Sequence, residues 1–452
     1  MISKTLKADM EGSSGTRKVY EEGLKLKKLH GEDKVVDFSL GNPVLEPPEE
    51  FNKILSDMIS KDVKGVHRYM PNAGHKEVRD SVAYHLDKKG YLPGVTGDHV
   101  CMTVGAAGAL NIIFKTILNK GEEVITINPH FQEYTFHIKN HQGEEVMVNT
   151  LEDYTLDLKA ISKKITSKTK AILLNTPNNP TGVMYSKESL EELASILREK
   201  EHKLKKQIYL VSDEPYREMV YEGKFTSPAS IYDNSFIVYS WSKSLSLPGE
   251  RTGYAAVNPK MKYEEDMIKG LAFSNKILGF VSAPAMIQFV LPKILNTEIE
   301  EKYYSYMRDY YKSMHRPLEK CLSESGYEFP KPKGAFFFWA KCLGSNKNAL
   351  EREKDFIEDA KDNFLTMLVP GSAFGKAGWF RISYASNLEV VNRGCERLAK
   401  IAEKYKTSKP KTLKRDRKEP EHCECCMTPV DNRPMDHYCD ESSEKSQEFD
   451  EH

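Results

Sequence analysis

The sequence predicts an α/β fold with a mainly parallel β-sheet. Short apolar and β-branched runs recur at 124–127, 171–174, 208–211 and 236–239, and each is followed by a turn rich in Gly, Pro, Asp or Ser. A helix candidate at 187–205 lies between two of these runs, and strands that alternate with helices are typical of a parallel sheet. Such sheets carry their chemistry at the carboxyl ends of the strands, so the residues that come directly after each run are the candidates for a site.

The composition is that of an ordinary globular protein with a large core. The 452 residues include 66 Lys plus Arg and 66 Asp plus Glu, so the formal net charge is zero. This balance excludes a global basic field for nucleic acid. No apolar run reaches the roughly 18 residues that a membrane span needs, and residues 1–14 lack the apolar core of a secretory signal. Scattered cysteines such as Cys101 and Cys321 indicate reduced thiols, so we expect a cytoplasmic enzyme.

The two ends of the chain differ in composition from the alternating region. The stretch up to about Asp33 is charged and predicts a helix with a partial apolar face. After about Tyr405, a basic run at 404–418 precedes an acidic stretch at 419–452 that holds four of the eight cysteines. Because this tail has few large apolar residues, we expect it to be mostly disordered and to bind no metal. The alternative is a soft-metal site, at a spacing tighter than that of a zinc knuckle, from His422, Cys423, Cys425, Cys426, His437 and Cys439.

Four turns that come after predicted strands carry small or polar residues. The turn at 103–110, TVGAAGAL, consists of small residues and opens a helix. The turn at 175–182, NTPNNPTG, is polar and contains two prolines, and SDEPY at 212–216 ends a strand with a carboxylate. The turn at 240–253, SWSKSLSLPGERTG, presents hydroxyls, an amine and a guanidinium. A lone lysine is usually a surface charge. Hydroxyls with a bidentate guanidinium make a phosphate site, and a lysine beside such a site can form a Schiff base with an aldehyde-bearing cofactor.

These motifs, in this order, make the sequence similar to the class I and II aminotransferases, which are fold-type I enzymes dependent on pyridoxal 5′-phosphate. The resemblance covers about residues 14–405. The segments SLGNP (39–43), RYMPNAG (68–74) and SLPGERTGY (246–254) are most similar to the bacterial aspartate-aminotransferase-like group. The resemblance implies the domains, the cofactor and the substrate contacts of that family.

The family architecture implies a large and a small domain. Residues 63–295 would form the large cofactor-binding domain with the mainly parallel sheet, and residues 296–405 would form a small α+β domain to which the segment 1–62 contributes. Residues 406–452 would remain as an appended tail. The cofactor would lie between the two domains and across the interface of a homodimer with shared active sites.

Four residues match the groups that surround the cofactor ring in the family. Lys243 matches the lysine that holds the cofactor through a Schiff base and then moves the proton at the α-carbon. Asp213 matches the carboxylate that keeps the ring nitrogen protonated, although a helix N-cap is an equally good interpretation of this residue alone. Tyr216 and Asn179 match the hydroxyl and the amide that meet the phenolic oxygen of the ring. Lys243, Asp213 and Tyr216 are the expected catalytic residues.

The resemblance also implies a cup for the cofactor phosphate. The small-residue turn would bind the anion through backbone amides at the start of a helix, where small side chains allow close approach. Tyr69 matches a tyrosine that reaches the phosphate from the neighbouring subunit, and a core tyrosine is the alternative. The residues matched to the cup are Gly105, Ala106, Ala107, Ser240, Ser242 and Arg251.

The remaining matches concern the ring face and the substrate. Phe131 matches the aromatic residue that stacks on the ring, and Tyr134 is the alternative. Arg381, in WFRISYA, matches the arginine that binds the substrate α-carboxylate in a bidentate pair. The backbone of Gly41 would close on the same carboxylate, and Asn179 is a further candidate contact.

The implied reaction is a ping-pong transfer of an amino group from an L-amino acid to a 2-oxo acid. Aspartate is the favoured donor and 2-oxoglutarate the favoured acceptor, while aromatic and branched amino acids remain open. Motifs place no second arginine for a dicarboxylate, and Lys276 is either an interface contact or a surface lysine. The alternatives are a carbon–sulfur β-lyase on the same fold and a non-catalytic cofactor-binding regulator. The regulator needs an N-terminal DNA-binding module, for which we expect no room, and we expect no nucleic-acid partner for the basic run at 404–418.

Overall fold

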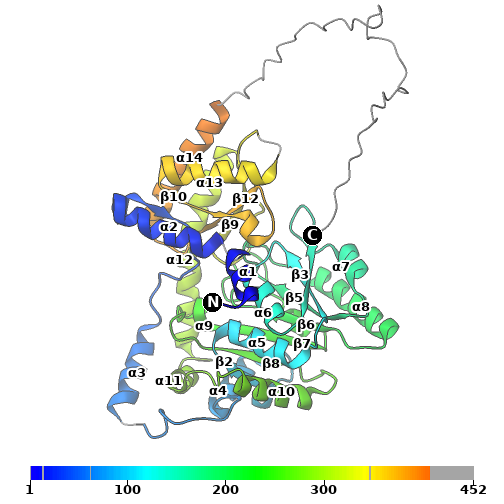
Figure 1. Ribbon diagram of the computed structural model, residues 1–452. Coiled ribbons are helices and arrows are strands. Elements are labelled where there is room, and N and C mark those ends of the chain that lie inside the picture. Colours follow the sequence, from blue (N-terminus) through cyan, green and yellow to red (C-terminus); the bar gives the residue numbers. More distant parts are fainter. Residues whose placement is uncertain (1, 13–14, 62, 346–347, 408–452) are drawn as a thin grey trace, which may run out of the picture. The chain divides into compact units, whose positions relative to one another are not determined.

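The computed structural model describes residues 2–12, 15–61, 63–345 and 348–407, and in this part of the chain the largest sheet has seven strands (Figure 1). The strand order is β2-β8-β7-β6-β5-β3-β4. The strands span Val100–Thr103 (β2), Glu123–Asn128 (β3), Glu144–Asn149 (β4), Thr169–Asn175 (β5), Tyr209–Asp213 (β6), Ser235–Ser240 (β7) and Gly253–Val257 (β8). Strands β3 to β7 pair in parallel, whereas β8 is antiparallel to both β7 and β2. The predicted α/β fold with a mainly parallel sheet is confirmed.

Helices form much of the rest of the described chain. They span Lys4–Gly12 (α1), Gly15–His30 (α2), Glu49–Ser60 (α3), Lys76–Lys88 (α4), Gly105–Ile117 (α5), Glu133–Asn140 (α6), Leu158–Lys164 (α7), Lys187–Leu204 (α8), Trp241–Ser244 (α9), Glu264–Ile277 (α10), Ala285–Val290 (α11), Glu298–Ser325 (α12), Ala349–Phe364 (α13) and Leu388–Thr407 (α14). The helix predicted at 187–205 is α8. The four predicted strand runs coincide with β3, β5, β6 and β7 to within two residues at either end.

The side chains of each central strand alternate between apolar cores on the two faces of the sheet. On β6, Val211 packs in the core that contains residues of α5 and α10, whereas its neighbour Leu210 packs with α7 and α8. The same alternation holds on β5, where Leu173 belongs to the first core and Leu174 to the second. A strand that is buried on both faces has a continuous apolar run as its sequence, which is why these strands could be predicted from short runs.

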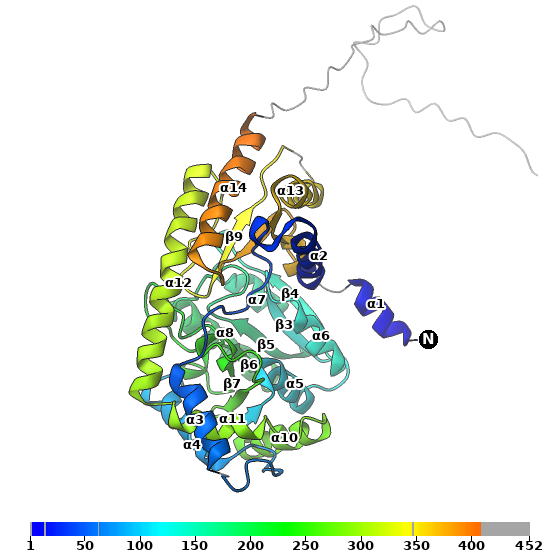
Figure 2. The ribbon, with the colours of Figure 1, turned by 90° about the vertical axis from the view of Figure 1, so that its left-hand side faces the viewer.

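Two smaller sheets carry the elements near the end of the described chain. Strands β11 (Val369–Pro370), β12 (Trp379–Ser383) and β9 (Phe337–Lys341) form an antiparallel sheet in that order, and β1 (Val36–Asp37) pairs in parallel with β10 (Thr366–Met367). The long helix α12 lies alongside α14 (Figure 2). No helix in the described residues has both the length and the apolar character to span a membrane.

The domain boundaries at 62 and 295 remain a prediction. Residues 1–407 form one compact unit. The tail after residue 407, with its candidate metal ligands, lies outside the described residues.

A buried charge network lies among α4, α12 and the segment that comes after β6. The ring nitrogens of His85, on α4, lie 3.5 Å from carboxylate oxygens of Glu218 and Glu300, one at each side of the imidazole. Glu218 also pairs with Arg217 at 3.3 Å. Burial acts to lower the pKa of His85, but the two carboxylates outweigh it and raise that pKa above its usual value. The imidazole is therefore stabilised as a cation between two acids.

We predict that His85→Gln lowers the free energy of unfolding by about 3 kcal/mol at pH 6, because the buried carboxylate of Glu300 loses its cation and that of Glu218 keeps only Arg217. The folded-state pKa of His85 lies above the unfolded value of about 6.5. The stabilisation is therefore complete below the unfolded pKa and is lost as the pH rises through the folded pKa. Urea unfolding of wild type and variant at pH 6 and pH 9 measures the penalty.

His202→Gln is the matched control, because His202 is exposed on α8 and should give a small difference at both pH values. A penalty for His85→Gln that stayed constant from pH 6 to pH 9 would contradict the assigned charge state.

Candidate active site

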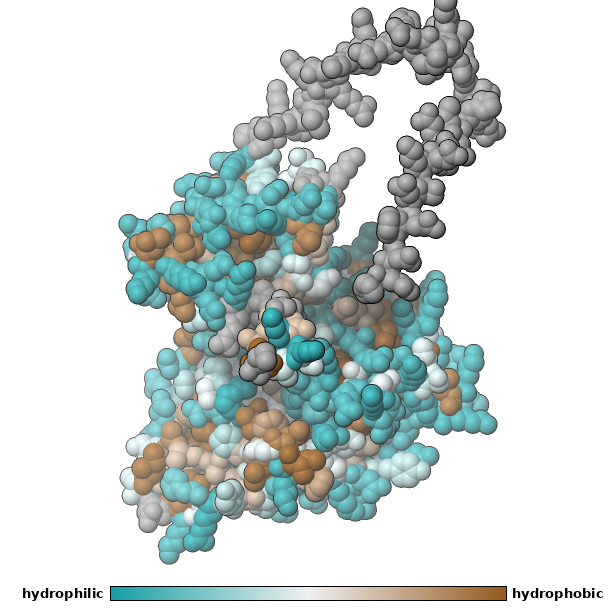
Figure 3. Space-filling model, viewed as in Figure 1, coloured by the Kyte–Doolittle hydropathy of each residue, from teal (hydrophilic) through white to brown (hydrophobic). Residues whose placement is uncertain are grey.

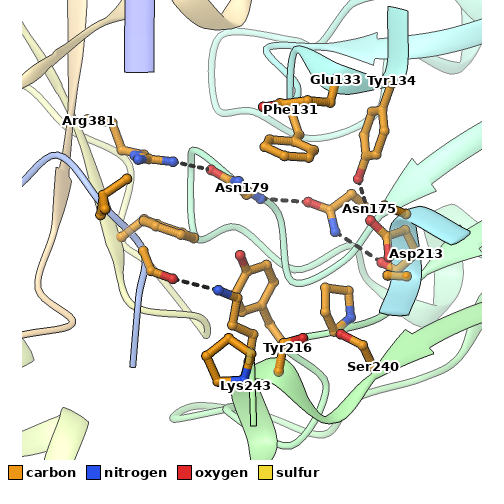
Figure 4. Close-up of a pocket in the computed structure, with 18 of the residues that line it drawn as sticks. Phe131, Glu133, Tyr134, Asn175, Asn179, Asp213, Tyr216, Ser240, Lys243 and Arg381 are labelled. Atoms are coloured by element: carbon orange, nitrogen blue, oxygen red, sulfur yellow. Dashed lines mark hydrogen bonds between the residues drawn. The ribbon is translucent and has the colours of Figure 1, made fainter. Parts of the chain in front are cut away.

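The carboxyl ends of β5, β6 and β7 open onto a cavity of about 700 Å³ (Figure 4). Asn175, Asp213 and Ser240 are the last residues of these three strands, and all three line the cavity. The parallel sheet thus brings together side chains that lie up to 65 residues apart in sequence. This is where open α/β sheets bind their ligands.

Most of the residues predicted from the sequence line this cavity. They are Gly41, Ala106, Ala107, Phe131, Asn179, Asp213, Tyr216, Ser240, Ser242, Lys243, Arg251 and Arg381. Gly105 lies at its edge beside Arg251. Tyr69 is not among the lining residues; its side chain is 94% exposed. Lys276 is exposed on α10 and does not line the cavity.

Asp213 carries a buried carboxylate that is only half paired. Its Oδ2 accepts a hydrogen bond of 2.5 Å from the hydroxyl of Tyr134, whereas its Oδ1 has no hydrogen-bond partner. Burial raises the pKa of Asp213 to about 7, although the Tyr134 hydrogen bond acts in the opposite direction. A buried carboxylate with one free oxygen fits a ligand that presents a positively charged N–H donor. The protonated ring nitrogen of pyridoxal phosphate is such a donor.

Tyr134 therefore has a role other than the one that the sequence suggested as an alternative. Its hydroxyl is committed to Asp213, and its ring meets Phe131 edge-on, with centroids 5.6 Å apart and an interplanar angle of 84°. Phe131 remains the candidate for the stacking residue. No local pattern could reveal the Tyr134–Asp213 contact, because the two residues are 79 positions apart.

Lys243 places an amine in the cavity, across from Asp213 (Figure 4). It lies on the short helix α9, directly after β7, and its Nζ donates to the backbone oxygen of Gly41 at 2.5 Å. Burial lowers the pKa of Lys243 to about 8, and the positive charges of Arg381 and Arg251 act in the same direction. An amine with a lowered pKa is a nucleophile at neutral pH. This fits the aldehyde of the cofactor.

The start of α5 forms the anion-binding end of the cavity. Gly105 has a φ of +67°, and a Cβ on it would lie 3.0 Å from Nη2 of Arg251. Gly253 packs against this turn so closely that a Cβ there would lie 2.8 Å from the backbone carbon of Gly105. The first amides of a 13-residue helix, with two hydroxyls and a guanidinium nearby, fit a phosphate group.

Arg381 is a buried cation, and no carboxylate of the described residues lies within ion-pair distance of it. Its guanidinium lies between the rings of Phe337 and Phe374, at 4.6 and 4.8 Å from their centroids. It donates to Oδ1 of Asn179 at 3.0 Å and to the backbone oxygen of Ser39 at 2.6 Å, while its Nε has no partner. Burial lowers the pKa of Arg381 to about 10. A carboxylate that entered the cavity would satisfy this charge.

A chain of amide hydrogen bonds connects the Arg381 side of the cavity to Asp213. The backbone N–H of Asn179 donates to Oδ1 of Asn175 at 2.7 Å, and Nδ2 of Asn175 donates to the backbone oxygen of Asp213 at 3.0 Å. These contacts fix the turn after β5 against the end of β6 (Figure 4). Tyr216 lies beside them, and burial raises the pKa of its hydroxyl, so it remains a hydrogen-bond donor. Asn175 is the first residue of the NTPNNPTG turn, but the sequence did not indicate that it contributes to the site.

Other lining residues were also missed by sequence reasoning. Tyr20, Glu21 and Leu24 reach the cavity from α2, and Glu133 reaches it from the start of α6. The partial apolar face of the N-terminal stretch indicated a helix, but not the surface against which it packs. Glu133 lies within the segment NPHFQEY, in which only aromatic residues were expected to contact the cofactor.

The comparisons with known proteins agree with this chemistry. The model of the family "Aminotransferase class I and II" matches residues 33–398. The aromatic-amino-acid aminotransferase 2 of Thermococcus litoralis is 29% identical over 406 residues, which cover 88% of this chain and 98% of that protein. The aspartate aminotransferase of Thermotoga maritima is 29% identical over 404 residues, with coverages of 88% and 96%. A crystal structure of an amino transferase from Eubacterium rectale superimposes with a TM-score of 0.81 at 31% identity and covers 90% of this chain and 99% of its own.

We predict that Tyr134→Phe weakens the binding of pyridoxal phosphate about tenfold. Loss of the hydrogen bond raises the pKa of Asp213 further, so at neutral pH the carboxyl group is protonated more often and cannot pair with a positive ring nitrogen. Equilibrium titration of the apoenzyme with cofactor at pH 7 measures the affinity.

Tyr209→Phe is the matched control, because Tyr209 lies on the same strand as Asp213 but its hydroxyl bonds to Gln207 instead. If both variants bound the cofactor as tightly as the wild-type enzyme does, the proposed role of the Tyr134 hydrogen bond would be refuted.

Proposed function

The chain belongs to the class I and II aminotransferases, and we propose from the cavity how its residues carry out the reaction of that family. The enzyme depends on pyridoxal 5′-phosphate and moves an amino group between an amino acid and a 2-oxo acid. One observation carries the assignment of roles. The amine of Lys243, the half-paired carboxylate of Asp213 and the guanidinium of Arg381 all line the same cavity.

When bound, the cofactor supplies an aldehyde and a ring that takes up the electrons left when the α-carbon loses its proton. Oδ1 of Asp213 would accept the hydrogen bond of the ring nitrogen, and the carboxylate charge would keep the proton on that nitrogen. Tyr216 and Asn179 would donate to the phenolic oxygen, and Phe131 would pack on the ring. The phosphate would be held by Gly105, Ala106, Ala107, Ser240, Ser242 and Arg251.

Lys243 has two tasks in this proposal. Its amine would first hold the cofactor. After release it would remove the proton from the α-carbon as a general base and deliver it to the cofactor carbon. A base must be neutral before it takes a proton, and the pKa of about 8 leaves a fraction of neutral amine near pH 7. The bond from Nζ to the backbone oxygen of Gly41 keeps the amine at the substrate side of the cavity.

Arg381 orients the amino acid. Its guanidinium would bind the α-carboxylate in a bidentate pair, which fixes the α-carbon next to the Lys243 amine. Asn179 and the backbone near Gly41 lie beside the same guanidinium, since Arg381 already donates to Asn179 and to the backbone of Ser39. They are the further contacts proposed for the substrate.

The donor is proposed as an L-amino acid, with aspartate and 2-oxoglutarate as the pair that the sequence favours. One similar protein is named an aspartate aminotransferase and another an aromatic-amino-acid aminotransferase, so the names support both side-chain classes. The charges of the side chains that line the cavity bear on which of the two classes is accepted.

We propose a homodimer in which each subunit completes the site of the other. Tyr69 supports this proposal, because an almost fully exposed tyrosine is available to a partner subunit. Phe273 and Ile277, on α10, are also exposed. Figure 3 shows hydrophobic residues at the lower end of the face that is turned toward the viewer. The four described cysteines are free thiols, which supports the cytoplasm as the location.

Absorbance spectroscopy of the purified holoenzyme tests the proposed function. We predict a visible band that Lys243→Ala lacks, because the variant has no amine for the cofactor aldehyde. Lys260→Ala, which removes an exposed lysine, is the matched control and should keep the band.

An amino acid should bleach the band of the wild-type enzyme, and only a 2-oxo acid should restore it. Recovery of the band without any acceptor acid would indicate the carbon–sulfur lyase instead. Absence of the band after incubation with the cofactor would overturn the assignment.

A further inference from the structure

Glu133 places a carboxylate in the substrate cavity. It is the first residue of α6 and lies two positions after the proposed stacking residue Phe131. Its half-buried side chain lines the cavity beside Phe131, on the wall that faces Arg381 (Figure 4). The contacts proposed for the cofactor and for the α-carboxylate do not use it.

The cations that line the cavity all have other tasks. Among the described residues they are Lys243, Arg251 and Arg381. In the proposed function Lys243 holds the cofactor, Arg251 contacts the phosphate and Arg381 binds the α-carboxylate. A donor with a second carboxylate therefore finds no further lining cation in the described part of this chain.

The electrostatics around Glu133 make a second negative charge unfavourable. Burial raises the pKa of Glu133, while its own backbone N–H and the charge of Arg381 act to lower it. The carboxylate is thus partly desolvated and is stabilised by the charge of Arg381. When a substrate α-carboxylate neutralises that guanidinium, a further acidic group nearby would meet Glu133 with little compensation.

We propose that Glu133 sets the donor specificity of this enzyme by disfavouring amino acids with a side-chain carboxylate. Donors whose side chain is uncharged, or presents an N–H group to the carboxylate, are favoured over the matching dicarboxylic acids. Asparagine is thus preferred to aspartate, from which it differs only in an amide. The inference therefore departs from the pair of aspartate and 2-oxoglutarate that motif similarity favours. The inference rests on the proposed function, because it assumes that Arg381 holds the α-carboxylate.

The test compares kcat/KM for aspartate and asparagine at pH 8, well above the usual glutamate pKa of about 4.3. Glu133→Gln keeps the size of the side chain and removes its charge. We expect the aspartate-to-asparagine ratio to rise at least about tenfold in this variant, and to rise further in Glu133→Lys. Glu144→Gln makes the same chemical change at an exposed position on β4, outside the cavity, and should leave the ratio unchanged.

An unchanged ratio in Glu133→Gln would overturn the inference. If Glu133 merely positioned Arg381, both donors would lose kcat/KM alike and the ratio would stay constant. Loss of fold or cofactor would be visible in the melting temperature and in the visible band. A wild-type enzyme that transaminates no donor would instead overturn the proposed function.

Binding of unreactive acids provides a readout that does not depend on turnover. Succinate and its monoamide, succinamate, have the same length but differ by one charge, and calorimetry on the holoenzyme measures both. We expect Glu133→Gln to bind succinate about tenfold more tightly than wild type does, without a comparable gain for succinamate. Equal gains for both acids, or none for either, would contradict a charge-based role for Glu133.

Discussion

The half-paired carboxylate of Asp213 is the interaction around which the site is arranged. It lies buried at the end of β6, where burial raises its pKa to about 7 and a single hydroxyl, that of Tyr134, stabilises its charged form. A bare carboxylate in such a place is costly, and a cationic donor at its free oxygen offsets that cost. The carboxylate at the end of the central strand β6 therefore favours binding of a cofactor whose ring nitrogen is protonated.

The other charged groups lie at different places along the cavity and favour different parts of the ligands. Helix α5 and Arg251 favour an anion at one end, and Arg381, which packs against the rings of Phe337 and Phe374, favours another at the opposite side. Burial lowers the pKa of the Lys243 amine, and the positive charges of both guanidiniums lower it further. Glu133 adds a negative charge to the substrate side. A single arrangement of charges thus accounts for cofactor orientation, base strength and the proposed choice of donor.

Sequence reasoning succeeded where the information is local. Buried strands are encoded by apolar runs, so they could be predicted from the sequence. Each strand-end turn carries a local motif, and the resemblance of these motifs to the family assigned Asp213, Lys243 and Asn179 to one site, which agrees with the cavity that they line. It failed where a role depends on a contact between distant segments. The Tyr134–Asp213 bond joins residues 79 positions apart, and the Lys243–Gly41 bond spans 202 positions. Glu133 was overlooked because only the aromatic residues of its segment were matched to the cofactor, and a carboxylate at the start of a helix is ordinary.

The protonation state of the cofactor ring nitrogen tests the central claim most directly. Nitrogen-15 NMR of the holoenzyme, loaded with cofactor labelled at that nitrogen, distinguishes the protonated from the unprotonated ring by chemical shift. The account predicts a protonated nitrogen at pH 8 in the wild-type enzyme and an unprotonated one in Asp213→Asn, which keeps the shape of the side chain but not its charge. An unprotonated nitrogen in the wild-type enzyme, or the same shift in both proteins, would contradict it.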